Sequence, residues 1–150
     1  MGSACELEKN DFAFPTYREH GVAWMRGVDP MKIMEVYRGI SNGGWDPLEH
    51  RCNSYTIVIG NQVLNGVGYA MGCTLDQSDD AAITYFGDGA TAQGDVNEGF
   101  VFASTFDAPF VFFFQNPWLI LHKHTPSASK VDAKTTSSFS SPSALAPSPN

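Results

Sequence analysis

Ala82-Ile-Thr-Tyr-Phe-Gly-Asp-Gly-Ala90 is an apolar run that ends in a glycine-rich turn, and a second apolar run follows from Pro109 to Phe114. Neither run alternates apolar with polar residues, which is typical of strands covered on both faces in a parallel sheet. Between them, residues 95–106 place their apolar side chains on one helical face. The sequence therefore predicts a right-handed strand, helix, strand unit within an α/β fold, in which a parallel sheet carries helices on both faces.

The turn Gly87-Asp88-Gly89 lies where the first strand is expected to end, the place at which open parallel sheets bind ligands. Its glycines let the backbone approach a phosphate, and Asp88 can hold a magnesium ion that bridges two phosphates. The same three residues also form ordinary turns, so the motif alone fits both interpretations. Asn116 follows the second run, so parallel pairing is expected to bring its side-chain oxygen beside Asp88 as a second magnesium ligand.

Two helices are expected before this unit. Asp29-Pro30 is typical of a helix start, with Asp as the N-cap and Pro at the first helical position. The segment from residue 57 to residue 72 is apolar and too long for a strand, which favours a helix over most of it. Gly68 and Gly72 lie on one face of that helix, where another helix can approach closely, either within the chain or in a second subunit.

The bulk composition excludes several classes of protein. The 150-residue chain has a formal net charge of -7, whereas a nucleic-acid surface needs clustered Lys and Arg. Its three cysteines are odd in number and widely spaced, which indicates neither a disulfide framework nor a zinc site. The sequence has no signal-peptide pattern and no apolar stretch long enough for a membrane span, so we expect one cytoplasmic domain.

The composition changes at Pro117. The remaining residues are rich in serine and proline and contain no glycine, and such a composition does not bury enough apolar surface to order itself. We therefore divide the chain into a domain at 1–118 and an unrelated tail at 119–150, and expect disorder from about Ser127 onward. His122 and His124 are interpreted as solvated side chains, because no carboxylate or cysteine completes a metal site with them.

Five stretches carry a family resemblance: Phe14–Trp24, Gly43–Asp46, Tyr55–Gly60, Gly68–Gly72 and Tyr85–Ala90. Together with the Gly-Asp-Gly turn, they resemble the alpha subunit of thiamine diphosphate-dependent 2-oxo acid dehydrogenases, of the bacterial pyruvate dehydrogenase type and its branched-chain kin. The resemblance covers residues 6 to 118. It implies a truncated thiamine diphosphate-binding fold, with thiamine diphosphate and Mg²⁺ as cofactors.

The resemblance also implies roles at matching positions. Arg18 is expected to bind the diphosphate, Ile59 to wedge under the bent cofactor, and Asp88 and Asn116 to bind the metal. The residues expected at the cofactor are Tyr17, Arg18, Ile57, Ile59, Gly87, Asp88, Gly89, Ala90 and Asn116. His20 is interpreted as structural, and no residue is nominated as catalytic.

The chain departs from the family pattern at Pro117. Family members carry two consecutive asparagines here, and ungapped alignment places the second, metal-binding one on Pro117, which has no side-chain oxygen. If one asparagine is deleted, Asn116 takes the ligand place. We expect a frameshift or other gene disruption near codon 117 and a missing helical segment before Tyr17, so that the chain is a fragment lacking both ends of the domain.

The resemblance implies a reaction that this chain would carry out together with partner proteins. A beta subunit in an alpha2-beta2 assembly would supply the activating glutamate, and a lipoyl acyltransferase would receive the acyl group after decarboxylation of a pyruvate or branched-chain 2-oxo acid. Two alternatives stay open: a non-catalytic truncated remnant of that subunit, or another thiamine diphosphate enzyme such as an acetoin dehydrogenase. Alone, the chain is expected to bind the cofactor weakly and to decarboxylate no 2-oxo acid.

Overall fold

The computed structural model describes residues 2–115. Its elements, in chain order, are α1 (Gly2–Cys5), β1 (Phe12–Phe14), α2 (His20–Met25), α3 (Pro30–Tyr37), α4 (Pro47–His50), α5 (Asn61–Leu75), β2 (Ala82–Gly87), the 3-10 helix η1 (Asp88–Ala92), α6 (Gly94–Thr105) and β3 (Phe110–Gln115). The expectations for Asn116, Pro117 and the 119–150 tail lie outside the described residues.

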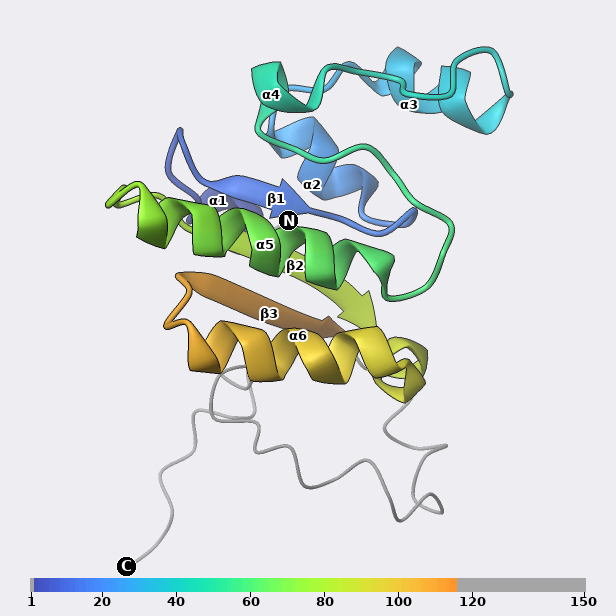
Figure 1. Ribbon diagram of the computed structural model, residues 1–150. Coiled ribbons are helices and arrows are strands. Elements are labelled where there is room, and N and C mark those ends of the chain that lie inside the picture. The colour runs from blue at the N-terminus through green and yellow to red at the C-terminus, as the bar shows by residue number, and fades with distance from the viewer. Residues whose placement is uncertain (1, 116–150) are drawn as a thin grey trace, which may run out of the picture.

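The strands form one parallel sheet in the order β1-β2-β3 (Figure 1). Ala82 pairs with Phe110 and Gly87 with Gln115, so β2 and β3 are in register along their whole length. Helix α6 connects them, which confirms the predicted strand, helix, strand unit. The helix begins and ends one residue earlier than the predicted range of 95–106.

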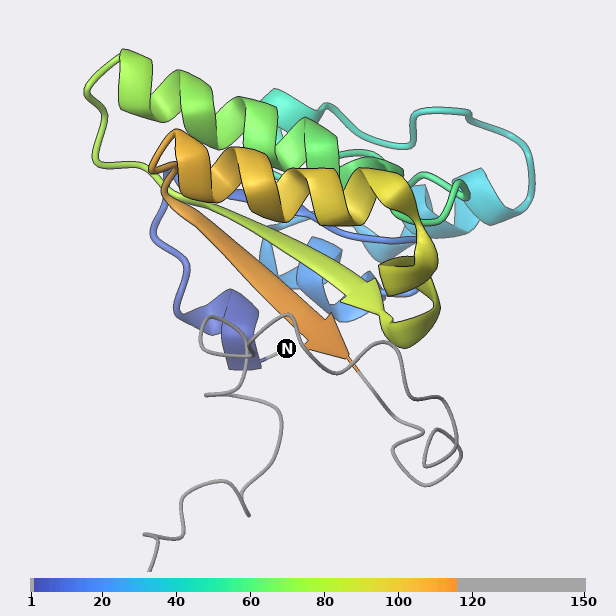
Figure 2. The same cartoon turned by 60° about the horizontal axis from the view of Figure 1, so that its bottom comes forward.

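Helices cover both faces of the sheet, as predicted (Figure 2). Because successive strand residues point to opposite faces, the even-numbered residues of the strands pack against α5 and α6. Odd-numbered residues, including Ala13, Ile83 and Tyr85, pack against α1, α2 and α3. In β1 and β2, burial on both faces explains why the sequences do not alternate, whereas Val111 of β3 stays 43% exposed.

Helix α5 begins later than its apolar sequence suggests. The prediction of a helix over most of 57–72 is correct from Asn61 onward, but the segment before it is not helical. Gly60 caps the helix in the left-handed region with φ of 86°, and this turn separates α5 from residues 57–59. The side chains of those three residues are more than half exposed.

The glycines that permit close packing are not the two singled out by their spacing. No described atom lies within 4 Å of the Cβ that Gly68 or Gly72 would carry. Close packing inside the described chain occurs instead at Gly66, where a Cβ would lie 2.6 Å from the Phe110 ring, and at Gly99, where it would lie 2.7 Å from Val63 Cγ1. A subunit contact at Gly68 and Gly72 stays a prediction.

The predicted start of α3 is confirmed. The Asp29 carboxylate accepts a hydrogen bond of 2.8 Å from the Met31 amide, and Pro30 is the first helical residue. Of the side chains expected on one face, Ile33 is buried, whereas Met34 and Tyr37 are both 55% exposed. None of the helices within residues 2–115 is long and apolar enough to cross a membrane.

Candidate functional site

A cavity of about 250 Å³ opens at the carboxyl ends of the strands. Its three walls are the Tyr-Arg wall after β1 (residues 16–19), the apolar wall before α5 (Thr56 and residues 58–60) and the glycine wall after β2 (residues 87–90), with Gln115 at the end of β3. Residues that are far apart in sequence thus meet at one edge of the sheet, where parallel sheets bind ligands.

The Tyr-Arg wall is held by side chains on both of its sides. The Thr16 amide donates a hydrogen bond of 2.7 Å to the Glu19 carboxylate, and the Tyr37 hydroxyl of α3 donates one to the Tyr17 carbonyl. The Arg18 guanidinium carbon lies 5.4 Å from the centre of the Tyr17 ring. These contacts fix the backbone of the wall and leave the exposed Arg18 side chain at the cavity.

The glycine wall is the turn from β2 into η1. Gly87 ends the strand opposite Gln115, and the Thr91 hydroxyl donates a hydrogen bond of 2.6 Å to the Asp88 carbonyl, which fixes the turn. A Cβ at Gly89 would meet no described atom within 4 Å, so this part of the wall opens into free space. The backbone here is open to close approach by a ligand, and binding of a phosphate at this turn stays a prediction.

The apolar wall places Ile59 at the cavity and leaves Ile57 outside it. Ile59 lines the cavity and is 52% exposed, whereas Ile57 is 82% exposed and absent from the lining. The turn at Gly60 sets this arrangement, because a Cβ there would lie 3.0 Å from Val96 Cγ2 of α6. The apolar wall thus rests against the start of α6.

Aromatic side chains surround the outer side of the Tyr-Arg wall. His20 begins α2, and its Nδ1 lies 3.1 Å from the Tyr55 hydroxyl, while its ring packs edge-on against Tyr37. Burial, followed by the nearby Cys52 and Tyr37, raises the pKa of Tyr55, so this hydroxyl stays protonated at neutral pH. His20 is not among the described residues that line the cavity.

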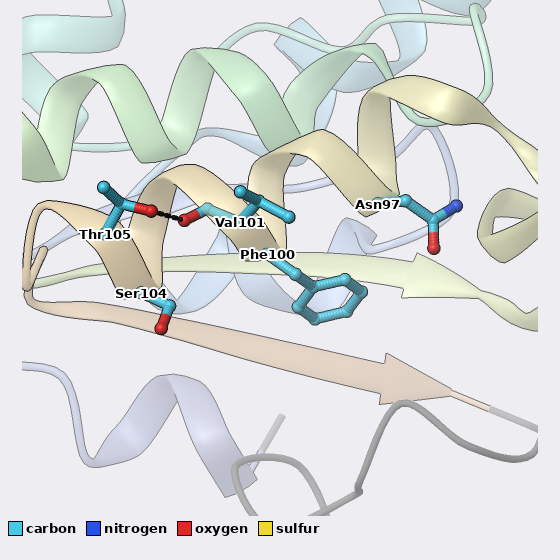
Figure 3. Close-up of a pocket in the computed structure, with 5 residues that line it drawn as sticks. All are labelled: Asn97, Phe100, Val101, Ser104 and Thr105. Carbon is cyan, nitrogen blue, oxygen red and sulfur yellow. Dashed lines mark hydrogen bonds between the residues drawn. The ribbon is translucent and has the colours of Figure 1, made fainter.

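A second hollow, of about 410 Å³, lies on the outer side of α6 (Figure 3). It is lined by Asn97, Phe100, Val101, Ser104 and Thr105, all from that helix. The Thr105 hydroxyl is already engaged, since it donates a hydrogen bond of 2.7 Å to the Val101 carbonyl. Because this lining contains no charged or nucleophilic group apart from hydroxyls, the cavity at the strand ends is the stronger candidate for a functional site.

The structure brings together Tyr17, Arg18, Ile59 and the whole Gly87–Ala90 turn, all of which the sequence singled out. It also adds residues that were not expected at a site: Thr16, Glu19, Thr56, Val58 and Gly60. Each of these lies within three residues of an expected one, so sequence adjacency was the available signal. Gln115 lines the cavity directly before Asn116, which lies outside the described residues.

Comparisons with known proteins identify the family. The family model for the dehydrogenase E1 component matches residues 1–122. The chain is 40% identical over 121 residues to the 3-methyl-2-oxobutanoate dehydrogenase subunit alpha of Mycobacterium tuberculosis, which covers 80% of this chain and 33% of that protein. It is 35% identical over 116 residues to the pyruvate dehydrogenase E1 component subunit alpha of Bacillus cereus, covering 77% of the chain and 31% of the relative.

A mammalian alpha subunit matches the chain with similar identity and coverage. The chain is 32% identical over 126 residues to the mitochondrial 2-oxoisovalerate dehydrogenase subunit alpha of Mus musculus, with 77% of the chain and 28% of that protein covered. The chain therefore spans about a third of the length of the curated relatives it matches. The resemblance seen in the sequence is confirmed, and the chain belongs to the dehydrogenase E1 component family.

Proposed function

We propose that this chain forms part of the alpha subunit of a thiamine diphosphate-dependent 2-oxo acid dehydrogenase and contributes the diphosphate-binding side of the cofactor site. The observation that carries the proposal is the convergence of Tyr17, Arg18, Ile59 and the Gly87–Ala90 turn on one cavity at the strand ends. These residues come from separate parts of the sequence, and each has the chemistry expected for one part of the cofactor.

The lining fits a diphosphate joined to an apolar ring system. Arg18 offers a planar guanidinium for phosphate oxygens, and the glycine wall offers backbone that a phosphate can approach. On the opposite side, Val58 and Ile59 expose apolar side chains that a ring can cover. The lining is thus polar where the diphosphate would lie and apolar where the rings would lie.

The size of the cavity favours a shared site. Sites for whole cofactors usually measure about 300 to 1,000 Å³, whereas this cavity measures about 250 Å³. Among the described residues that line it, Arg18 is the single cation, and the same lining holds the carboxylates Glu19 and Asp88. We infer that the chain alone holds the cofactor weakly and that a beta subunit completes the site.

A magnesium ion fits beside Asp88. No group of three or more His, Cys, Asp or Glu side chains within residues 2–115 is placed to bind a metal, so the described protein atoms do not form a full coordination shell. Mg²⁺ commonly takes only one or two carboxylates and fills its remaining positions with phosphate oxygens and water. Asp88 would be the carboxylate ligand, and Asn116 remains the second ligand implied by the resemblance.

Bound thiamine diphosphate would supply the carbon that attacks a 2-oxo acid and drives its decarboxylation. This chain's residues would bind and orient the cofactor, with Arg18 and the glycine wall at the diphosphate and Ile59 against the rings. The names of the relatives include pyruvate and branched-chain 2-oxo acid dehydrogenases, so we propose a 2-oxo acid of one of these two kinds. Transfer of the acyl group to a lipoyl acyltransferase completes the proposal.

Calorimetric titration of the purified chain with thiamine diphosphate and Mg²⁺ tests the proposal. We expect weak, magnesium-dependent binding that is abolished by Asp88→Ala, and no decarboxylation of pyruvate or branched-chain 2-oxo acids by the chain alone. Asp95→Ala is the matched control, because Asp95 lies in the first turn of α6 and not in the cavity lining.

Three results would count against this account. Binding that survives Asp88→Ala unchanged would place the cofactor elsewhere. Tight, micromolar binding would show that the site is more complete than proposed, and turnover without a beta subunit would contradict a shared active site.

A further inference from the structure

Gln62 is a buried polar residue at the start of α5. Its side chain has no exposed surface, and its Nε2 donates a hydrogen bond of 2.8 Å to the carbonyl oxygen of Tyr85 in β2. Its other polar atom, Oε1, is buried and has no hydrogen-bond partner among the described residues. A buried polar atom without a hydrogen-bond partner lowers the free energy of unfolding. Stability alone therefore does not explain a buried amide that makes a hydrogen bond through one of its two polar atoms.

The hydrogen bond replaces one that the sheet would otherwise make. The Phe12 amide donates to the Ala81 carbonyl at 3.0 Å, so the odd-numbered carbonyls of β2, including that of Tyr85, face β1. By this register the donor for the Tyr85 carbonyl would be the Thr16 amide, two residues beyond the end of β1, but this amide instead donates to Glu19 in the Tyr-Arg wall. Gln62 thus supplies the missing donor at the point where the chain leaves the sheet to form the cavity.

Gln62 also connects two walls of the cavity. It lies two residues after Gly60 of the apolar wall, and its partner Tyr85 lies two residues before Gly87 of the glycine wall. The hydrogen bond from Gln62 Nε2 to Tyr85 O directly joins the segments that carry these walls. Because the bond is buried on both sides, water does not compete for it.

We propose that Gln62 is a positioning residue that sets the distance between the apolar wall and the glycine wall. The inference rests on the proposed function, because the distance matters only for a ligand that touches both walls. Thiamine diphosphate would touch both, with its rings on the apolar wall and its diphosphate on the glycine wall. Inorganic diphosphate would touch Arg18 and the glycine wall but not the apolar wall, so its binding would not depend on the distance that Gln62 sets.

The test compares these two ligands, each with Mg²⁺, on the full 150-residue chain and on Gln62→Met, which keeps the volume of the side chain and removes its donor. We expect Gln62→Met to raise the Kd for thiamine diphosphate about tenfold or more and to change the Kd for inorganic diphosphate less than about twofold. Asn65→Met is the matched control, because the Asn65 side chain donates its hydrogen bond of 3.2 Å to Asn61 of the same helix and, within residues 2–115, joins no wall of the cavity.

The outcomes separate the inference from the proposed function. Equal weakening of both ligands, or no weakening of either, would overturn the positioning role of Gln62. A wild-type chain that binds neither ligand would overturn the proposed function, and the inference with it. If Gln62→Met does not fold, NMR of the ¹⁵N-labelled wild-type chain decides: the Gln62 side-chain amide must shift on adding thiamine diphosphate, and an unchanged signal would overturn the inference.

Discussion

The Tyr37 hydroxyl of α3 donates a hydrogen bond to the Tyr17 carbonyl, and this contact ties a separate helix to the wall of the cavity that carries Arg18. Burial, followed by the nearby Glu19, raises the pKa of Tyr37, so the hydroxyl keeps its proton and acts as a donor at neutral pH. The backbone of the Tyr-Arg wall is therefore fixed from outside the wall.

Tyr37→Phe removes this donor and keeps the ring. We expect the Kd for thiamine diphosphate to rise a few-fold, because the Tyr17-Arg18 backbone loses an anchor. The free energy of unfolding should fall by no more than about 1 kcal/mol, since the bond is exposed to solvent. Tyr69→Phe is the control, because the Tyr69 hydroxyl accepts a hydrogen bond from Arg51 away from the cavity lining. Equal binding by the Tyr37→Phe variant and the wild type would contradict the prediction.

Two glycines of α5 should respond in opposite ways to alanine. Gly66→Ala would place a Cβ 2.6 Å from the Phe110 ring, and such overpacking should lower the free energy of unfolding by about 1 to 3 kcal/mol. Gly68→Ala would meet no described atom within 4 Å and should raise it by up to about 1 kcal/mol, because alanine favours the helix. Urea unfolding of both variants measures the difference, and the same sign for both would show that α5 packs otherwise.

Stability should decline at alkaline pH because of Cys52. Burial raises the pKa of this thiol from its ordinary value near 9.0 to about 12. Between these values the unfolded chain loses a proton that the folded chain keeps, so the stabilisation is full below about pH 9 and is lost as the pH rises toward 12. Cys52→Ala removes this titrating thiol. The fall in the free energy of unfolding with rising pH should then become shallower by up to about 1.4 kcal/mol per pH unit.

Urea midpoints between pH 8 and pH 11 check this prediction. Tyr55 and Tyr85 are present in both chains, and the part of their raised pKa that comes from burial cancels in the comparison. The nearby Cys52 also raises the pKa of both hydroxyls, so the measured difference is that of Cys52 together with its coupling to these two tyrosines. Cys5→Ala, at an exposed position, controls for the loss of a thiol as such. If the urea midpoints of the wild type and of Cys52→Ala change with pH in parallel, the folded chain does not hold a proton on this thiol.

The central part of the fold could be predicted because its signals are local. β2 and β3 are apolar runs without alternation, and the helix between them shows a regular apolar face, so the crossover unit was predicted from sequence alone. β1 was missed because it consists of three residues, Phe12–Phe14, whose pairing partner lies some seventy positions further along the chain. A strand this short is defined by tertiary pairing and not by propensity.

The residues of the candidate site also fall into those that the sequence predicted and those that it did not. The Gly87–Ala90 turn stands out locally, and Tyr17 and Arg18 were singled out through a family resemblance. Gln62 was not predicted, because the sequence of an apolar helix does not show to which backbone carbonyl a glutamine in it donates. Its role follows from Thr16 leaving the sheet, which is a property of the folded chain.

β3 pairs with β2 on one side, and within the described residues no strand pairs with its other side. Its sequence, Phe110-Val-Phe-Phe-Phe-Gln115, has no proline, glycine or charge, which is the composition of segments that stack between chains. Such an edge is a template on which an extended segment of another molecule can add. We therefore expect self-association by strand addition that rises with concentration, and a charged substitution of the half-exposed Val111 should reduce it.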